Sequence, residues 1–279
     1  MKLTIAQLKG RIKSLAQKNN ADPRVLMRMY MMERFLERVA SSQYRDHFII
    51  KGGILVTNMI GVALRSTMDI DASIKNESLT EEHLLDMISS ICEINLDDDV
   101  SFRVKKTQQI MDEMEYPGIR VAMDATIGQM PIPMKLDIST GDIITPREIK
   151  YSYQLLIENR SISLKSYNKE TVLAEKLQTI LARGILNTRM RDFYDIHELT
   201  NLYSDTINTE TLKAAFEATC SKRGTTNLSE HGADILLELS RNTELHKLWR
   251  TYQDKYTYAA NISYSDIMAS TSDLFNMVT

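Results

Sequence analysis

Hydrophobic residues recur at helical spacing along the first part of the chain and again along its last part. One of these patterns opens at Thr80, which has a capping side chain and is followed by two glutamates in the first predicted turn. In the first part the predicted helices are 3–19, 22–41, 54–63 and 80–93. In the last part they are 169–184, 189–203, 208–221, 229–240, 243–258 and 264–276.

Between these two helical parts the apolar residues alternate with polar ones, as they do in half-buried strands. Turn residues separate the alternating segments at Pro117–Gly118, Gly128 and Gly141–Asp142. The predicted strands are 66–75, 100–110, 119–127 and 134–138. We therefore predict an α+β chain, with a mixed or mostly antiparallel sheet in a domain over 1–165 and a helical domain over 166–279.

The composition limits the classes of function. The chain has 279 residues and a formal net charge of −3, so a nucleic-acid partner would have to meet a local basic patch. Cys92 and Cys220 are isolated, and the five histidines lack ligand spacing, which excludes a disulfide framework and a zinc site. No apolar run reaches membrane-spanning length. We expect a cytoplasmic protein with no membrane contact.

Two glycines stand where an apolar strand-like run meets a predicted helix, in the sequence IKGGIL. Gly52 and Gly53 would let a ligand approach backbone N–H groups at a helix N-terminus, which favours phosphate. Lys51 comes directly before them and is either a phosphate neighbour or a solvated strand end.

Acidic residues alternate with apolar ones in two of the predicted strands. Asp69 and Asp71 are two positions apart and so face the same side of a strand, and Asp137 occupies a similar position in MKLDIST. A lone pair of this kind is most often a solvated strand edge. Within apolar strands, however, such acids are costly unless a cation compensates them, and Mg²⁺ prefers oxygen ligands. The pattern predicts that all three can meet on one face of the sheet and hold Mg²⁺ or Mn²⁺.

Four motifs occur together in a particular order. They lie in FIIKGGILVTNMIGVALRSTMDIDASI, in PMKLDISTGDIITP and in TVLAEKLQTILARGILNTRMRDFYDIHEL. This order resembles the AbiEii-type nucleotidyltransferases, the toxin halves of type IV toxin–antitoxin systems. The resemblance implies a polymerase-beta-like nucleotidyltransferase sheet with flanking helices and a helical C-terminal domain. It also implies metal-dependent nucleotide transfer from an NTP and neutralisation by a cognate antitoxin. One departure is Gly52–Gly53, where the wider superfamily usually has Gly-Ser.

The resemblance also assigns roles to individual residues of this chain. Its implied metal ligands are Asp69, Asp71 and Asp137, the last of which acts as base or second-metal ligand. Its implied nucleotide-binding residues are Lys51, Gly52, Gly53, Arg65 and Thr67. From the residues alone, Arg65 is equally a salt-bridge partner, and Thr67 is more often an ordinary strand residue.

A second group of charged residues lies on the predicted helices. Lys176 lies on the rim of a buried stripe, where a lysine usually only solubilises the helix. The resemblance makes Lys176 a phosphate contact and Asp192 a catalytic residue that orients Lys176 or the substrate, with Asp195 structural. From spacing alone, these two acids could simply complement the helix dipole.

Three functions remain open at the level of sequence. The first, suggested by the resemblance, is nucleotide transfer to the 3′ end of tRNA, which would block translation. The others are transfer to a protein hydroxyl and non-catalytic binding of nucleotide or antitoxin. The basic patch for tRNA would draw on Lys105, Lys106, Arg183, Arg189, Arg191, Lys222 and Arg223. Trp249 and the tyrosines at 252, 256, 258 and 264 either stack on bases or, more commonly, pack between helices.

Overall fold

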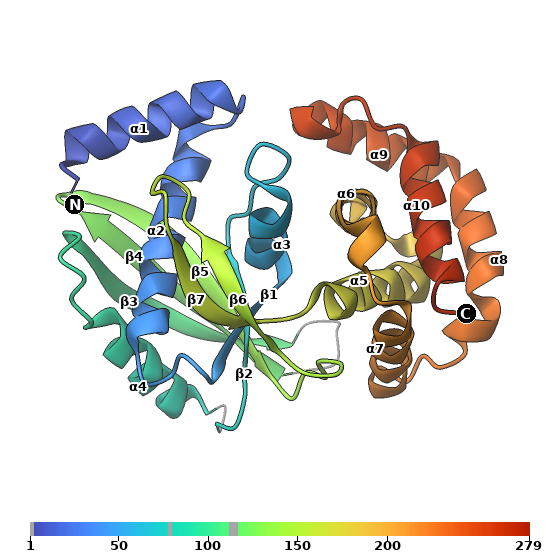
Figure 1. Cartoon of the computed structure of the whole chain (residues 1–279), viewed down its shortest axis with the longest axis horizontal. Helices are drawn as coiled ribbons and strands as arrows, with labels where there is room; N and C mark the ends of the chain where they lie inside the picture. Colours follow the sequence, from blue (N-terminus) through green and yellow to red (C-terminus); the bar gives the residue numbers. More distant parts are fainter. Residues whose placement is uncertain (1–2, 78–79, 112–116) are drawn as a thin grey trace. The chain divides into compact units, whose positions relative to one another are not determined.

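The computed structural model describes residues 3–77, 80–111 and 117–279 (Figure 1). It divides into two compact units. The first comprises Met1–Asp142 and Ile149–Ser166, and the second comprises Ile143–Glu148 and Tyr167–Thr279. The first contains a mixed sheet with flanking helices and the second contains helices, so the predicted α+β fold class is confirmed.

Seven strands form one sheet in the first unit, in the order β3-β4-β5-β2-β1-β7-β6. β2 runs parallel to β5 and β1 runs parallel to β7, while the other neighbours are antiparallel. The strands are β1 (Phe48–Lys51), β2 (Ile70–Ile74), β3 (Val100–Met111), β4 (Pro117–Ile127), β5 (Met130–Thr140), β6 (Ile149–Gln154) and β7 (Ser161–Ser166). The sheet is therefore mixed, with its acid-bearing strands β2 and β5 in the middle.

β2, β4, β6 and β7 differ from the sequence expectation. β6 and β7 lie after Pro146, where only helices were predicted, because the short alternation in SISLKS buries Ile162 and Leu164 on one face of the sheet. Pro117 and Gly118 belong to β4 rather than to a turn. β2 begins at Ile70, so Asp69 directly precedes the strand predicted to contain it.

Four helices accompany the sheet. α2 packs against β5, β7 and α4, and α4 packs against β3, so these two helices cover one face (Figure 1). α3 packs against β1 and β2. Their bounds are α1 (Ile5–Lys18), α2 (Pro23–Ser41), α3 (Gly52–Ile60) and α4 (Glu81–Cys92). Side-chain caps at Thr4, Asp22 and Thr80 begin three of them, as sequence capping rules expect.

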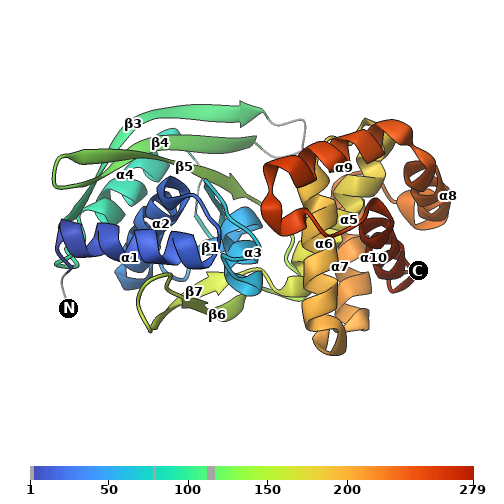
Figure 2. The ribbon, with the colours of Figure 1, turned by 90° about the horizontal axis from the view of Figure 1, so that it is seen from above.

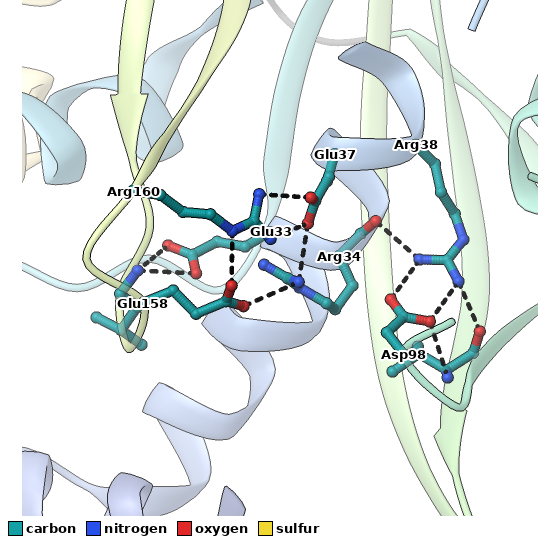
Figure 3. Close-up of polar contacts among 9 residues, drawn as sticks. Glu33, Arg34, Glu37, Arg38, Asp98, Glu158 and Arg160 are labelled. Atoms are coloured by element: carbon teal, nitrogen blue, oxygen red, sulfur yellow. Dashed lines mark hydrogen bonds and ion pairs between the residues drawn. The ribbon is translucent and has the colours of Figure 1, made fainter. Parts of the chain in front are cut away.

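An ion-pair network joins α2 to the β6–β7 turn (Figure 3). Arg34 Nη1 lies 2.8 Å from Glu37 and 3.0 Å from Glu158. Arg160 closes the ring at 2.6 Å from each of the same two carboxylates. Arg34 is only 4% exposed, so its pairs are shielded from solvent, whereas Arg160 is 43% exposed. The network holds the edge hairpin against the helix mainly through Arg34.

Glu33 lies next to this network and is buried, and both its carboxyl oxygens accept the Leu156 N–H at 3.0 Å. Burial raises the pKa of Glu33 to about 8 from 4.5, and Glu158 and Glu37 add to the rise, although Leu156 and Arg34 oppose it. The stability contributed by the protonated carboxyl is therefore complete below pH 4.5 and is lost as the pH rises through about 8. We expect Glu33→Gln to match the wild type near pH 4.5 and to exceed its unfolding free energy by on the order of 2 kcal/mol at pH 8.

Urea unfolding at both pH values measures this difference. Glu244→Gln is the control, because Glu244 is 71% exposed and pairs with Lys247 in a surface contact whose loss should change stability by at most about 0.5 kcal/mol at either pH. A Glu33→Gln difference that is the same at both pH values would contradict a raised pKa at Glu33.

The second unit consists of helices arranged around α5. α5 packs against α6, α7, α8 and α10 (Figure 2). The helices are α5 (Lys169–Arg183), α6 (Met190–Tyr203), α7 (Thr209–Lys222), α8 (Leu228–Arg241), α9 (Thr243–Lys255) and α10 (Tyr264–Asn276). All six agree with the sequence expectation to within a few residues, because each buries a clear apolar stripe.

Candidate active site

The glycine pair forms the junction between β1 and α3. Gly52 has a positive φ of 57°, and a Cβ there would overlap the Asp71 carboxylate. Gly53 N–H donates a hydrogen bond of 3.0 Å to Asp71 Oδ2. A Cβ on Gly53 would lie 2.6 Å from the Thr67 hydroxyl oxygen. The two glycines are therefore required by the close approach of Asp71 and Thr67 to the start of α3.

Arg65 supports the start of α3 through two hydrogen bonds. It is 2% exposed, and its Nη1 donates to the Gly53 carbonyl at 2.7 Å and to the Thr57 hydroxyl at 2.8 Å. The Thr67 hydroxyl donates to the carbonyl of Asp69 at 3.3 Å, which links the helix start to the first acid. Both residues hold the backbone around the predicted nucleotide site, and direct nucleotide contact by either one stays a prediction.

Gly53→Ala is expected to damage the site and the fold together. The added methyl must displace Thr67 and Arg65, and such overpacking typically costs about 1–3 kcal/mol of unfolding free energy. Gly10→Ala is the matched control, because a Cβ at Gly10, within α1, meets no atom within 4 Å and should stabilise the helix by roughly 0.5–1 kcal/mol. Chemical denaturation of both variants measures the contrast. Equal stability changes would contradict the close packing at Gly53.

Pairing of two strands brings the acids together. β2 and β5 place Asp71 directly opposite Asp137, and Asp69 lies two residues before Asp71. Burial raises the pKa of Asp71, and the neighbouring Asp137 and Asp69 raise it further against the Gly53 N–H and Lys51. Burial also raises the pKa of Asp69, with Asp137 adding to the effect and Lys135 and Arg120 opposing it. Both carboxyl groups are therefore harder to ionise than a free aspartate, chiefly because they are removed from water.

Asp137 has a partner that the sequence did not suggest. Arg120 on β4 binds both of its oxygens, with Nε at 2.7 Å from Oδ1 and Nη2 at 2.6 Å from Oδ2. Arg120 is a single cation within the apolar alternation of its strand, and that position is the signal that could have identified it. Asp137 would have to exchange this bidentate pair for a metal in order to act as a ligand.

The fit to a divalent cation is therefore uneven. Asp69 and Asp71 suit a hard cation, because they supply carboxylate oxygens whose raised pKa values a positive charge would lower. Over residues 3–77, 80–111 and 117–279, no three acidic, histidine or cysteine side chains are arranged to hold a metal ion. Metal binding by Asp69, Asp71 and Asp137 stays a prediction.

The Lys51 side chain contacts two residues near the end of β5. Its Nζ donates to Ser139 Oγ at 2.7 Å and lies 2.5 Å from Asp142 Oδ2, in a carboxylate that is 2% exposed. Ser139 follows Asp137 in β5, and Asp142 lies just after the strand. No sequence motif marked either one as a site residue. Lys51 thus ties the end of β1 to the end of β5, next to the acids.

The second group of predicted residues lies in the helical unit. Lys176 Nζ on α5 lies 2.7 Å from Asp192 and 2.7 Å from Asp195, both on α6. Lys176 is 12% exposed and Asp195 is fully buried. The lysine is therefore a partly buried, doubly paired cation rather than a solubilising side chain on the surface.

The predicted basic patch is distributed over several elements. Lys105, on β3, pairs with Asp124 at 3.3 Å. Arg223 hydrogen-bonds Gln178 and Thr179 of α5, and Arg191 donates to the Tyr256 hydroxyl. Within this predicted patch, the cations with exposed side chains are Lys105, Lys106, Arg189 and Lys222. Arg191 and Arg223 thus have defined structural partners.

A mixed sheet that brings acids from neighbouring strands next to a glycine-initiated helix is the arrangement of a nucleotidyltransferase. The chain belongs to the AbiEii family of nucleotidyl transferase toxins of type IV toxin–antitoxin systems, whose family model matches residues 34–270. The chain is thus a nucleotidyltransferase, and its family implies an NTP substrate and an antitoxin partner.

Solved structures provide further similarities. The chain is similar to JHP933 from Helicobacter pylori, at 16% sequence identity and a TM-score of 0.48, over 91% of this chain and 90% of that one. It is also similar to an antigenic nucleotidyltransferase-like protein from Paracoccidioides brasiliensis, at 15% identity and a TM-score of 0.40, over 82% and 94% of the two chains. A comparison with curated protein sequences finds no match. Within the described residues, no helix is long and apolar enough to cross a bilayer.

Proposed function

We propose that this protein transfers a nucleotide from an NTP to the 3′ end of tRNA in the cytoplasm, with Mg²⁺ or Mn²⁺, and so blocks translation until its antitoxin neutralises it. The observation that carries the proposal is the position of Asp71. Its carboxylate accepts the Gly53 N–H and lies opposite Asp137, at the start of a helix whose positive dipole end favours a triphosphate. The free thiols of Cys92 and Cys220 are compatible with a reducing compartment.

In the proposed reaction the acceptor hydroxyl attacks the α-phosphorus in line, the bond to the β-phosphate oxygen breaks, and pyrophosphate leaves. A divalent cation, when bound by Asp69 and Asp71, supplies charge neutralisation and lowers the pKa of the attacking hydroxyl. Asp137, once an oxygen is released from Arg120, accepts the hydroxyl proton. Gly52 and Gly53 present backbone to the triphosphate.

Lys176 contributes positive charge to the triphosphate in this proposal. Asp192 lies 2.7 Å from its ammonium and fixes the direction of the side chain. Asp195, which is fully buried, pairs with the same ammonium at 2.7 Å. The lysine is therefore preorganised, which reduces the entropy lost when it meets a phosphate.

The salt dependence of transfer tests the tRNA part of this proposal. Phosphate contacts release counterions, so transfer to tRNA should fall steeply between 50 and 200 mM salt, by about 10³-fold for six contacts, while NTP binding should change much less. tRNA whose 3′-terminal ribose has been oxidised with periodate is the matched control and should accept no nucleotide. Transfer that persists on oxidised tRNA, or that is insensitive to salt, would contradict attack by the 3′ hydroxyl of a tRNA bound through its phosphates.

A further inference from the structure

A group of tyrosines surrounds the C-terminal end of α9. The rings of Tyr256 and Tyr258 stack at 5.3 Å with an interplanar angle of 22°. Tyr252 lies 4.7 Å from Tyr256, and Tyr194 lies 4.9 Å from Tyr258. Tyr194 and Tyr252 are buried, whereas Tyr256 and Tyr258 remain partly exposed. The group therefore has a buried base, formed by Tyr194 and Tyr252, and a partly exposed edge, formed by Tyr256 and Tyr258.

Two cations lie over the ring of Tyr256. The guanidinium carbon of Arg191 is 5.4 Å from the ring centre, and its Nη2 donates to the Tyr256 hydroxyl at 3.1 Å. The exposed ammonium of Lys255 is also 5.4 Å from the same ring centre. Lys255 is exposed, so its ammonium can move from this ring to a phosphate of a ligand. The uncovered ring and the two positive charges then favour a ligand that is both flat and anionic.

The tyrosine group is connected to the nucleotide-handling residues through α6. Arg191 directly precedes Asp192 in that helix, and Asp192 and Asp195 both pair with Lys176. A ligand that stacks on Tyr256 would therefore bind the same helix that positions the proposed phosphate-binding lysine.

We infer that Tyr256 and Tyr258, together with Arg191 and Lys255, form a stacking site for the single-stranded end of the RNA acceptor. The inference rests on the proposed function and adds the way the acceptor end is held. Base stacking on aromatic rings tolerates any sequence, and arginine and lysine meet the phosphates that join the stacked bases. Bases within a duplex already stack on one another, so the site selects unpaired nucleotides. Trp249, which is 1% exposed and stacks on Tyr252, belongs to the buried base of the group and not to this site.

Fluorescence anisotropy with a labelled single-stranded RNA pentanucleotide tests the inference without requiring activity. Tyr256→Ala removes the ring and should weaken binding by about 10-fold, within the range that a single stacked base contributes. Tyr256→Phe keeps the ring while losing only the hydroxyl that Arg191 contacts, and should stay within about 2-fold of the wild type. Tyr203→Ala, at the far end of α6, is the control for the loss of a partly exposed tyrosine and should also bind normally. A blunt RNA duplex should bind all four proteins alike.

Two further measurements separate the possible failures. The emission of Trp249, the single tryptophan of the chain, reports whether Tyr256→Ala keeps its fold, and Tyr256→Phe provides the comparison if it does not. If the wild type labels tRNA and Tyr256→Ala matches it in RNA affinity and in KM for tRNA, the stacking site is wrong while the proposed function stands. If the wild type labels only protein and binds no RNA, both are wrong. A raised KM for tRNA in Tyr256→Ala, with unchanged NTP affinity, supports the site.

Discussion

Asp71→Asn is expected to abolish nucleotide transfer while leaving the protein at least as stable as the wild type. The amide keeps the shape of the side chain and can still accept the Gly53 N–H, but it cannot supply the negative charge that a divalent cation requires. We expect a loss of at least about 10³-fold in kcat, since a misplaced metal removes both activation of the hydroxyl and charge stabilisation.

The stability result follows from the direction of the pKa shift. Because burial raises the pKa of Asp71 above its ordinary value, ionisation of this carboxyl disfavours folding at neutral pH. The stability of the protonated form is present at low pH and is lost as the pH rises through the raised pKa, so the neutral Asn should be most favourable at neutral and higher pH. Steady-state transfer assays and thermal unfolding at pH 7 measure the two effects.

Asp124→Asn is the matched control for this prediction. Asp124 is also a nearly buried acid in the sheet, but it pairs with Lys105 on β3 and has no proposed catalytic role. Its replacement should leave kcat within about 2-fold of the wild type. Full activity in Asp71→Asn, or equal losses in both variants, would contradict the catalytic assignment of Asp71.

Lys176→Met is expected to remove transfer and to destabilise the protein by about 3 kcal/mol. The substitution leaves the fully buried Asp195 without the lysine ammonium at 2.7 Å, and breaking a buried ion pair typically costs about 3–5 kcal/mol. Because the stability loss alone could lower activity, a single variant cannot distinguish a catalytic lysine from a structural one.

A double substitution separates these roles. Lys176→Met with Asp195→Asn removes the fully buried carboxylate together with the ammonium and should recover much of the lost stability, since replacing both partners of a buried pair is often nearly neutral. Asp192, which is 14% exposed, still loses the lysine in the double variant. The double variant should nevertheless stay inactive if the ammonium contacts the triphosphate. Recovery of NTP binding and transfer together with stability would show that Lys176 only supports the fold.

Much of the fold could be predicted from local patterns. The helices from α5 to α10 bury regular apolar stripes, and the long strands from β3 to β5 alternate over many residues. β6 and β7 were missed because each has only six residues, and their alternation becomes informative only when β7 pairs with β1. Short strands depend on partners that are distant in the sequence.

In the candidate site, too, local spacing could be predicted from the sequence, whereas contacts between strands could not. Period-two spacing indicated that Asp69 and Asp71 face one side of a strand, but the pairing of β2 with β5 that places Asp71 opposite Asp137 is not encoded locally. The sequence also could not show that Arg120 forms a bidentate pair with Asp137, because that contact depends on the register of β4 against β5. The register between these strands and the burial of the acids can be known only from the folded sheet.

The most direct test of the account is to incubate the purified protein with each of the four α-labelled NTPs and Mg²⁺, in the presence of total tRNA or total protein. We expect label on tRNA with the wild type, and none with Asp71→Asn or when a chelator removes the metal. Label found only on protein, or label on tRNA that Asp71→Asn produces as well as the wild type, would contradict metal-dependent transfer to tRNA by this site.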